Sequence, residues 1–274
     1  MRFFSTLTSI LASASLFSSI PTASADADFE SVRTRLDRDH SGKAGDPEEK
    51  YFHESVFHPH YDGRFADRTL GYEERRPSLV AMVQAYLFTM ADIGAETWIM
   101  HGSLIGWWWN RKILPWDSDI DVQVTLETLR FLRSYYNLAT FHFESAALNG
   151  TGRDYMLEIN PTFDEDNKFD HLNRIDARWI DTETGVFIDI TAVRPNETAR
   201  ALGVEGALRC KDMHHYLEED IFPLRDSVFE GMPCKVPYEY SWLLEEEYGR
   251  ESMTRTEIEF HRWNATSGEW EPRR

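Results

Sequence analysis

Apolar residues recur along parts of the chain at the spacing of three and four residues that one face of an α-helix requires. The longest such run predicts a helix that Gly94 ends, and the last run predicts a helix that Gly249 closes. The apolar positions are Leu79, Met82, Val83, Tyr86, Leu87, Met90 and Ile93 in the first run, Leu126, Leu129, Leu132 and Tyr136 in the second, and Tyr240, Leu243, Leu244 and Tyr248 in the third.

Other segments alternate polar and apolar residues, as half-buried strands do. The run Asp-Ile-Asp-Val-Gln-Val is the clearest of them. We expect strands at residues 96–100, 119–124, 155–159, 175–180 and 186–193. A tryptophan-rich loop follows the first strand, and the last two strands form a pair joined around Thr184 and Gly185. This mixture of elements predicts an α+β or α/β fold around a central sheet.

The chain divides into four segments by composition. Arg2, a stretch rich in Ser and Thr, and the small residues Ala23-Ser24-Ala25 predict a secretory signal peptide over residues 1–25, with a disordered or helical tail as the alternative. The hydroxyl residues argue against a stable transmembrane span. We expect an irregular N-terminal arm over residues 26–78, one domain over residues 79–250, and a C-terminal tail over residues 251–274 that packs on the domain or trails it.

Net charge, glycosylation sequons and the two cysteines indicate which class of protein and which compartment fit the chain. With 47 Asp and Glu against 29 Lys and Arg, the net charge of −18 argues against a nucleic-acid-binding protein, because such proteins need Lys and Arg. Sequons at Asn149, Asn196 and Asn264 agree with the secretory pathway. In that oxidising compartment Cys210 and Cys234 can form a disulfide, and two buried thiols are the alternative.

Carboxylates on two predicted strands are the main candidates for chemistry. Because side chains alternate along a strand, Asp119 and Asp121 share one face, and Asp117 joins them if the strand starts early. Asp189 has the same position on the strand at 186–193. If the strands are neighbours, these carboxylates converge, and hard oxygen ligands select Mg²⁺ or Mn²⁺. An ordinary solvent-facing acidic strand is the alternative.

A calcium-binding EF-hand loop beginning at Asp117 does not fit. Such a loop needs Gly at its sixth position and Glu at its twelfth, where this chain has Val122 and Thr128.

A Gly102-Ser103 turn lies upstream of the aspartates. Such a turn lets backbone N–H groups and a hydroxyl approach a phosphate closely. Between the turn and the aspartates, Arg111 and Lys112 are candidates to neutralise a diphosphate, with a solvated loop as the alternative. The nearby tryptophans can stack on a sugar or a nucleobase, although we expect at least two of them to pack in the core. They are Trp107, Trp108, Trp109 and Trp116.

The segment Gly-Ser-Leu-Ile-Gly at 102–106, followed by Leu-Pro-Trp-Asp-Ser-Asp-Ile-Asp at 114–121, resembles the signature of the LicD/fukutin family. Blocks at 185–191, 220–231 and 248–249 are similar to the family's later motifs and occur in the same order. The likeness extends over roughly residues 79–249. The tryptophan-rich loop and the run at 175–181 resemble the fungal branch, which is associated with mannosylphosphorylation of the cell wall.

That resemblance implies a nucleotidyltransferase-like α+β fold of the polymerase-β type, with a mixed sheet flanked by helices. It also implies transfer of a phosphorylated group from a nucleotide diphosphate donor to a glycan. By the same resemblance, Gly102 and Ser103 bind phosphate, and the metal-binding catalytic carboxylates are Asp119, Asp121 and Asp189. Two departures bear on activity: Trp109 occupies a position where many bacterial members have Arg, and Ser118 replaces one Asp of the acidic block.

Three functions remain open. The first is a Mg²⁺- or Mn²⁺-dependent phosphotransferase in the Golgi lumen, secreted or in the cell wall, in which Arg111, Lys112 and Trp109 contribute to donor binding. The second is a non-catalytic regulator or carbohydrate-binding relative, which the departures at Trp109 and Ser118 motivate. The third is an ordinary glycosyltransferase with an Asp-x-Asp motif, which transfers the bare sugar.

Overall fold

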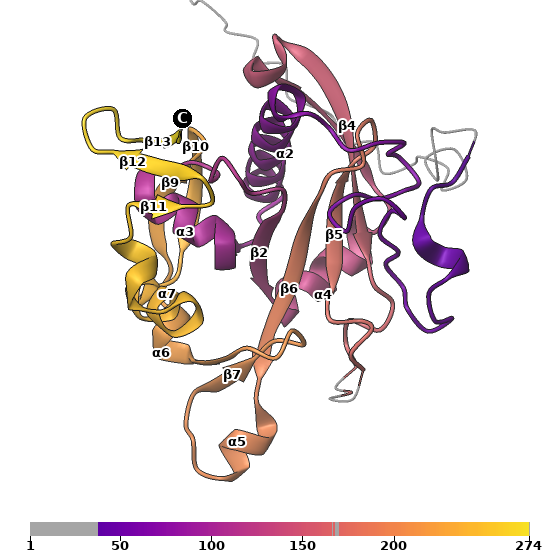
Figure 1. Cartoon of the computed structure of the whole chain (residues 1–274). Helices are drawn as coiled ribbons and strands as arrows, with labels where there is room; N and C mark the ends of the chain where they lie inside the picture. Colours follow the sequence, from indigo (N-terminus) through magenta and orange to yellow (C-terminus); the bar gives the residue numbers. More distant parts are fainter. Residues whose placement is uncertain (1–37, 166, 168–169, 274) are drawn as a thin grey trace, which may run out of the picture.

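A mixed β-sheet forms the centre of the structure, a computed structural model that describes residues 38–165, 167 and 170–273 (Figure 1). Its strands have the spatial order β1-β2-β6-β5-β4-β3, and β7 and β8 extend it from β6. β2 and β6 are parallel, whereas the other paired strands are antiparallel. The bounds are β1 Thr97–Ile99, β2 Ile120–Thr125, β3 Thr140–Ser145, β4 Thr151–Ile159, β5 Ala177–Asp181, β6 Phe187–Pro195, β7 Ala207–Arg209 and β8 His215–Leu217.

The two central parallel strands form as their alternation predicts. Val122 on β2 and Ile188 and Ile190 on β6 are fully buried or nearly so, and they face the hydrophobic core. The predicted strand pair is the antiparallel β5–β6 hairpin. Its turn contains Gly185 at a φ of 73°, a left-handed conformation that glycine adopts without a steric penalty.

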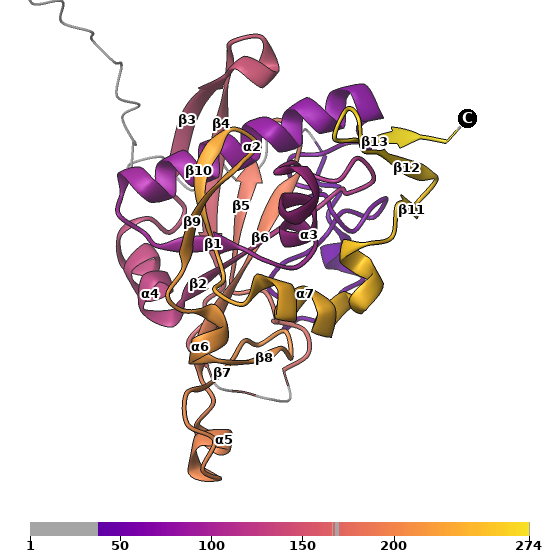
Figure 2. The same cartoon turned by 90° about the vertical axis from the view of Figure 1, so that its left-hand side faces the viewer.

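Helices flank the sheet, as the rotated view in Figure 2 shows. The three helices predicted from apolar spacing are present as α2, α4 and α7, and Gly249 caps the last of them. The bounds are α2 Tyr72–Asp92, α3 His101–Asn110, α4 Leu126–Tyr135, α5 Glu197–Ala201, α6 Glu218–Ile221 and α7 Tyr240–Tyr248, with short 3₁₀ turns η1 Gly42–Ala44, η2 Ala146–Leu148 and η3 Arg250–Met253.

Neighbouring residues of β5 show what covers each face of the sheet. Trp179 is fully buried and packs edge-on against Tyr86 of α2. Arg178 points to the opposite face, where it bonds to Glu54 of the N-terminal arm. Helix α2 and the described part of the arm therefore cover opposite faces of the sheet.

Two expected boundaries are corrected. Helix α2 begins at Tyr72, so the end of the predicted arm (residues 26–78) is helical; its first turn is polar and exposed and gives no apolar periodicity. The predicted tryptophan-rich loop is helix α3, in which Trp107 is buried and Trp108 and Trp109 are partly buried. The run of three tryptophans hides the helical spacing there, because it places aromatic residues on several sides of the helix.

The C-terminal part adds two small sheets that the sequence pattern did not predict. A hairpin of β9 and β10 precedes α7, and a three-stranded sheet of β11, β12 and β13 follows it. Trp263 and Trp270 of the latter sheet lie with their ring centres 4.8 Å from that of Trp109 in α3. Residues 251–273 thus pack on the domain. The bounds are β9 Arg225–Phe229, β10 Met232–Val236, β11 Glu257–Ile258, β12 His261–Asn264 and β13 Glu269–Pro272.

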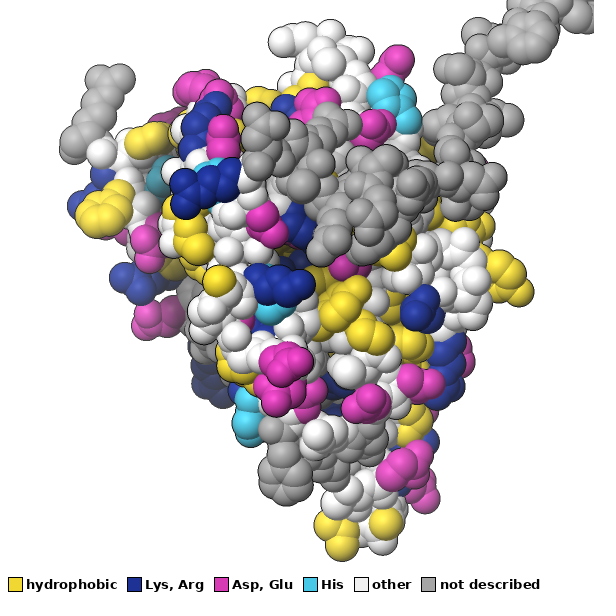
Figure 3. Space-filling model, turned by 90° about the vertical axis from the view of Figure 1, so that its right-hand side faces the viewer, with side chains coloured by type: hydrophobic (Ala, Val, Ile, Leu, Met, Phe, Trp, Pro, Cys, Tyr) yellow, Lys and Arg dark blue, Asp and Glu magenta, His cyan; other side chains and the backbone are white. Residues whose placement is uncertain are grey.

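The charged residues are mixed on the face drawn in Figure 3. Lys and Arg side chains there are interspersed with Asp and Glu and do not gather into one broad basic surface.

The order of the helices and strands and the topology of the sheet are those of an α+β fold with a mixed sheet and flanking helices, as predicted.

Candidate functional site

The parallel pairing of β2 with β6 brings the predicted carboxylates together at one edge of the sheet. Asp121 and Asp189 are direct partners in this pairing, so their side chains leave the sheet on the same face. Asp119 lies two residues before Asp121, at the entrance to β2. The condition named in the sequence analysis, that these two strands are neighbours, is met by this register.

A cavity of about 550 Å³ opens beside this edge. One wall is acidic and contains Asp117, Asp119 and Asp121, and Gly102 borders it. Another part of the lining is aromatic and aliphatic and comes from α3, the loop after it and the C-terminal segment, which also contributes Glu251 and Glu259; its apolar members are Trp109, Trp116, Trp270, Ile105, Leu114 and Ile258. The cavity thus joins a place for a charged group to a surface on which rings can stack.

Burial and mutual repulsion raise the pKa values of two carboxyl groups in the acidic wall. Burial, and then repulsion by Asp119 and Asp189, holds the pKa of Asp121 well above its ordinary value. Burial and the neighbouring Asp119 raise the pKa of Asp117 to about 7. The Nδ1 of His60 lies 3.8 Å from a carboxylate oxygen of Asp119, and the oxygen donors of these crowded carboxylates fit a hard divalent cation such as Mg²⁺ or Mn²⁺.

Asp189 differs from Asp121, its neighbour on β2, because it already has a cationic partner. The Nε of Arg178 donates to one of its oxygens at 2.8 Å, and Nη2 of the same arginine donates to Glu54 at 2.8 Å. Burial raises the pKa of Asp189, and Arg178 opposes that rise. Within residues 38–165, 167 and 170–273, the three aspartates are not among the groups whose ligand atoms all lie within 4.8 Å of one another. Asp189 is thus a neighbour of the pair, held toward Arg178.

The Gly102-Ser103 turn opens helix α3 directly behind the cavity. Gly102 lies on the cavity wall, where an added Cβ would be 3.8 Å from a carboxylate oxygen of Asp117. The buried Ser103 hydroxyl accepts a hydrogen bond from the backbone N–H of Asp121 at 3.1 Å. In this structure Ser103 therefore positions the start of β2, and its contact with phosphate stays a prediction.

Arg111 and Lys112, the expected phosphate-binding cations, do not line the cavity. The guanidinium carbon of Arg111 lies 4.0 Å from the ring centre of Trp107, and the guanidinium donates to the carbonyl oxygens of Trp107 and Trp108 in α3. The amine of Lys112 pairs with Glu269. Neither residue lines the cavity, whereas Trp109 does. Arg255, which follows η3, also lines it, and the structure shows no ion pair for its side chain with any residue described. Sequence analysis missed Arg255 because it lies outside every motif.

Residues 94–239, more than half of the chain, match the LicD/FKTN/FKRP nucleotidyltransferase domain. The chain belongs to the LicD/fukutin family. The predicted family and the α+β fold it implies are therefore confirmed, and the match covers the Gly102 turn, the acidic pair and Asp189.

Two curated relatives from Saccharomyces cerevisiae are similar to this family member. Mannosyltransferase regulator 4 is 34% identical over 122 residues, which are 44% of this chain and 10% of the relative. Mannosyltransferase regulator 14 is 31% identical over 128 residues, which are 47% of this chain and 13% of the relative. The aligned part of this chain thus covers only a small share of either relative. Both names agree with the predicted fungal branch.

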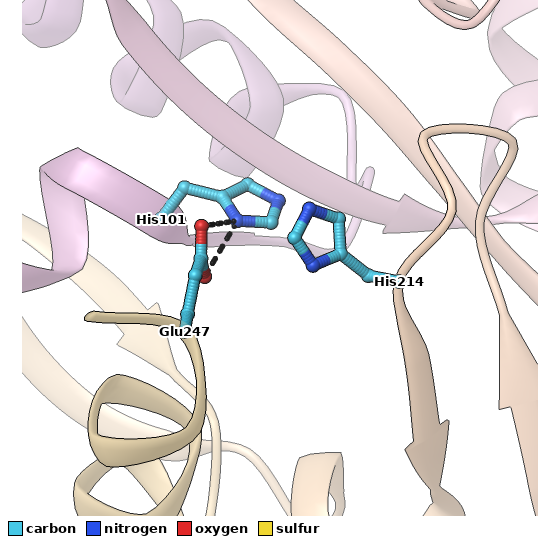
Figure 4. Close-up of side chains that lie close together, drawn as sticks. All are labelled: His101, His214 and Glu247. Atoms are coloured by element: carbon cyan, nitrogen blue, oxygen red, sulfur yellow. Dashed lines mark hydrogen bonds and ion pairs between the residues drawn. The ribbon is translucent and has the colours of Figure 1, made fainter. Parts of the chain in front are cut away.

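A second group of polar side chains includes His101, the residue directly before Gly102 (Figure 4). His101, Glu247 and His214 come from the start of α3, the end of α7 and the residue before β8, and their ligand atoms lie within 4.8 Å of one another. Burial raises the pKa of Glu247, but the interactions with His101, Tyr248 and His214 together outweigh this, so the net shift is downward. Burial and His101 lower the pKa of His214. No sequence pattern marks this group, since its members are far apart in the chain.

The remaining predicted site residues lie away from the cavity. Asn149 is exposed in a left-handed turn after η2, whereas the side-chain oxygens of Asn196 and Asn264 accept bonds from their own turns. Cys210 and Cys234 are buried free thiols, so the structure does not form the disulfide considered above. They lie at the end of β7 and on β10, which belong to different sheets.

The predicted signal peptide, residues 1–25, lies outside the described residues. In the part of the chain that is described, no helix has the length and apolar character needed to cross a membrane.

Proposed function

We propose that this chain is a metal-dependent phosphotransferase that moves a sugar phosphate, mannose phosphate in the first instance, from a nucleotide diphosphate donor to a glycan hydroxyl. The observation that supports this most is the register of Asp121 with Asp189 on parallel strands, beside a cavity that also contains Asp117, Asp119 and the Gly102 turn. The names of the two yeast relatives direct the proposal toward mannose.

The acidic wall suits a divalent cation. Asp119 and Asp121 would hold Mg²⁺ or Mn²⁺, with the second oxygen of Asp189 as a further ligand, because Arg178 bonds to only one of its oxygens. When bound, such an ion neutralises the donor diphosphate and stabilises the leaving nucleoside monophosphate. Asp117 lines the cavity beside this pair and is placed to accept the proton of the acceptor hydroxyl.

Donor and acceptor would share the rest of the cavity. The N-terminus of α3 offers backbone N–H groups to phosphate oxygens, and Arg255, which has no ion pair with a described residue, offers a guanidinium. Trp109, Trp116 and Trp270 offer aromatic faces to a sugar or a nucleobase. The acceptor hydroxyl oxygen attacks the phosphorus that carries the sugar. The bond from that phosphorus to the bridging oxygen breaks, nucleoside monophosphate leaves, and the phosphate travels with the sugar.

The test uses the purified full chain with Mn²⁺, a panel of nucleotide-linked sugars and an oligomannoside acceptor. The expected result is release of nucleoside monophosphate together with a product that contains radiolabelled phosphate from the sugar-bearing position. Release of nucleoside diphosphate with an unlabelled product would instead identify a glycosyltransferase. Asp121→Asn should be inactive, and so should the wild type in excess EDTA; activity in either would reject the mechanism.

A second candidate is a non-catalytic regulator of a mannosylphosphate transferase. The pairing of Asp189 with Arg178 and the names of both yeast relatives favour it. It predicts that neither Mn²⁺ nor a nucleotide-linked sugar binds the chain, which calorimetric titration measures directly. For either role we propose the secretory pathway, in the Golgi lumen, at the cell wall or outside the cell, with a nucleotide-linked donor and a glycan as partners and no nucleic acid.

A further inference from the structure

His101, His214 and Glu247 form a cluster of two imidazoles and a carboxylate that the proposed reaction does not use. The ring centres of His101 and His214 are 4.5 Å apart, and the ligand atoms of His101, His214 and Glu247 all lie within 4.8 Å of one another. Figure 4 shows Glu247 on one side of the His101 ring and His214 on the other.

The hydrogen bonds of His101 leave one nitrogen free. Its Nδ1 lies 2.8 and 2.9 Å from the two carboxylate oxygens of Glu247, and since a carboxylate accepts hydrogen bonds, Nδ1 carries the hydrogen. In the neutral ring Nε2 then keeps a lone pair. That atom is buried and has no hydrogen-bond partner among the residues described, and the residue as a whole is only 8% exposed.

A buried lone pair without a partner is costly, and a metal ion would satisfy it. Metal-bound histidines characteristically donate their other ring N–H to a carboxylate, which fixes the ring orientation. Glu247 provides that carboxylate here. Figure 4 also shows a ring nitrogen of His214 turned toward the side of His101 that carries the free nitrogen.

We propose that His101 and His214 bind a divalent transition metal of the zinc class, with Glu247 as the partner that orients His101. Imidazole nitrogen prefers Zn²⁺, Co²⁺ and related ions over Mg²⁺, which distinguishes this site from the all-oxygen donors of the cavity. Water completes the coordination shell, since two protein nitrogens leave positions open.

The site would connect three separate elements behind the cavity. His101 begins α3 at a φ of 52°, which is strained for a residue other than glycine, and it directly precedes Gly102. Glu247 lies in the last turn of α7, next to Tyr248 of the cavity wall, and His214 precedes β8. A bound ion would hold the Gly102 turn against α7 without entering the cavity.

The test is a titration of the chelator-treated full chain with Co²⁺, followed by visible absorption, and then displacement of Co²⁺ by Zn²⁺. The wild type should bind one equivalent with the absorption of nitrogen-ligated Co²⁺. His214→Ala should weaken binding about 100-fold or more, and Glu247→Gln, which still accepts the His101 hydrogen bond, about tenfold.

His215→Ala is the matched control, because His215 is the next residue and is exposed; it should bind as the wild type does. Asp119→Ala should also keep this site, which separates it from the proposed reaction. The proposal is overturned if the wild type shows no such absorption, or if a folded His214→Ala, verified by circular dichroism, binds Co²⁺ with unchanged affinity. Should His214→Ala not fold, unchanged affinity in Glu247→Gln overturns it.

Discussion

Two clusters of potential metal ligands lie close to the Gly102 turn, and they differ in how their charges are balanced. In the cavity, Asp117, Asp119 and Asp121 repel one another and have raised pKa values where a shift is resolved. Behind the turn, Glu247 is paired with His101 and its pKa is lowered. The first cluster therefore favours a bound cation for its electrostatic balance, whereas in the second the carboxylate already accepts a hydrogen bond from His101, and the other nitrogen of that ring has no partner among the described residues.

The difference indicates that two clusters close to one short turn would select different classes of metal ion. Oxygen donors at the open side select a hard ion that can meet phosphate, and nitrogen donors at the buried side select an ion that binds more firmly and has no substrate. The predictions below separate the two clusters, beginning with the largest effect.

Asp121→Asn should lower transfer activity on the order of a thousandfold, equivalent to about 4 kcal/mol of transition-state stabilisation, because it removes a central ligand of the proposed reaction. Co²⁺ binding behind the turn should not change. Steady-state release of nucleoside monophosphate and the Co²⁺ titration measure the two effects on the same preparation. Loss of Co²⁺ binding in a folded Asp121→Asn would show that the clusters are not independent.

Arg178→Gln should lower the free energy of unfolding by about 3 kcal/mol, because it leaves the carboxylates of Asp189 and Glu54 without their buried partner. Arg130→Gln is the matched control, since Arg130 pairs with Asp164 at the surface. That change should cost less than about 1 kcal/mol. Urea denaturation of both variants gives the comparison, and equal losses would contradict a structural role for Arg178.

Ser103→Ala should cost about 1–2 kcal/mol of stability, because the N–H of Asp121 loses its hydrogen-bond acceptor. Ser134→Ala on the exposed face of α4 is the control and should be close to neutral. If Ser103 instead served only to bind phosphate, chemical denaturation would show no difference between the two variants.

Asp117→Asn should change the pH dependence of stability in the metal-free chain. The folded chain retains a proton on Asp117 up to a pKa of about 7, whereas the unfolded chain releases it near the ordinary value of 3.8. The contribution of Asp117 to the free energy of unfolding is therefore full below pH 4 and is lost as pH rises to 7. The variant should flatten this decline, measured by urea denaturation in EDTA.

Glu74→Gln is the control for that measurement. Its hydrogen bond from Arg68 lowers the pKa of Glu74 to about 2, so its stability contribution changes only in more acidic solution. Between pH 5 and 7 the Glu74→Gln profile should run parallel to the wild type. An unchanged slope in Asp117→Asn would mean that Asp117 titrates near its ordinary value.

The sequence predicted the elements whose periodicity was strong and local. Alternation at residues 119–124 and 186–193 predicted β2 and β6, because one face of each is buried and the other carries the aspartates. The polar first turn of α2 and the tryptophan run of α3 broke that periodicity. The short strands β11, β12 and β13 were too brief to give a pattern.

The site was predicted only where its residues belong to a motif. Asp119, Asp121 and Gly102 lie close together in the sequence and at the cavity in space. The salt bridge from Arg178 to Asp189 could not be predicted, since it depends on strand register. Arg255 and the group of His101, His214 and Glu247 depend on how the C-terminal helix packs against α3, and no spacing in the sequence encodes that contact.

The most direct test of the central claim is Mn²⁺ binding followed by electron paramagnetic resonance of the free ion, in the metal-free wild type, Asp189→Asn and His214→Ala. The account predicts that the wild type and His214→Ala bind Mn²⁺ alike, and that Asp189→Asn binds it at least about tenfold more weakly. Equal Mn²⁺ affinity in Asp189→Asn and the wild type would contradict the claim that β2 and β6 together form the metal-binding edge.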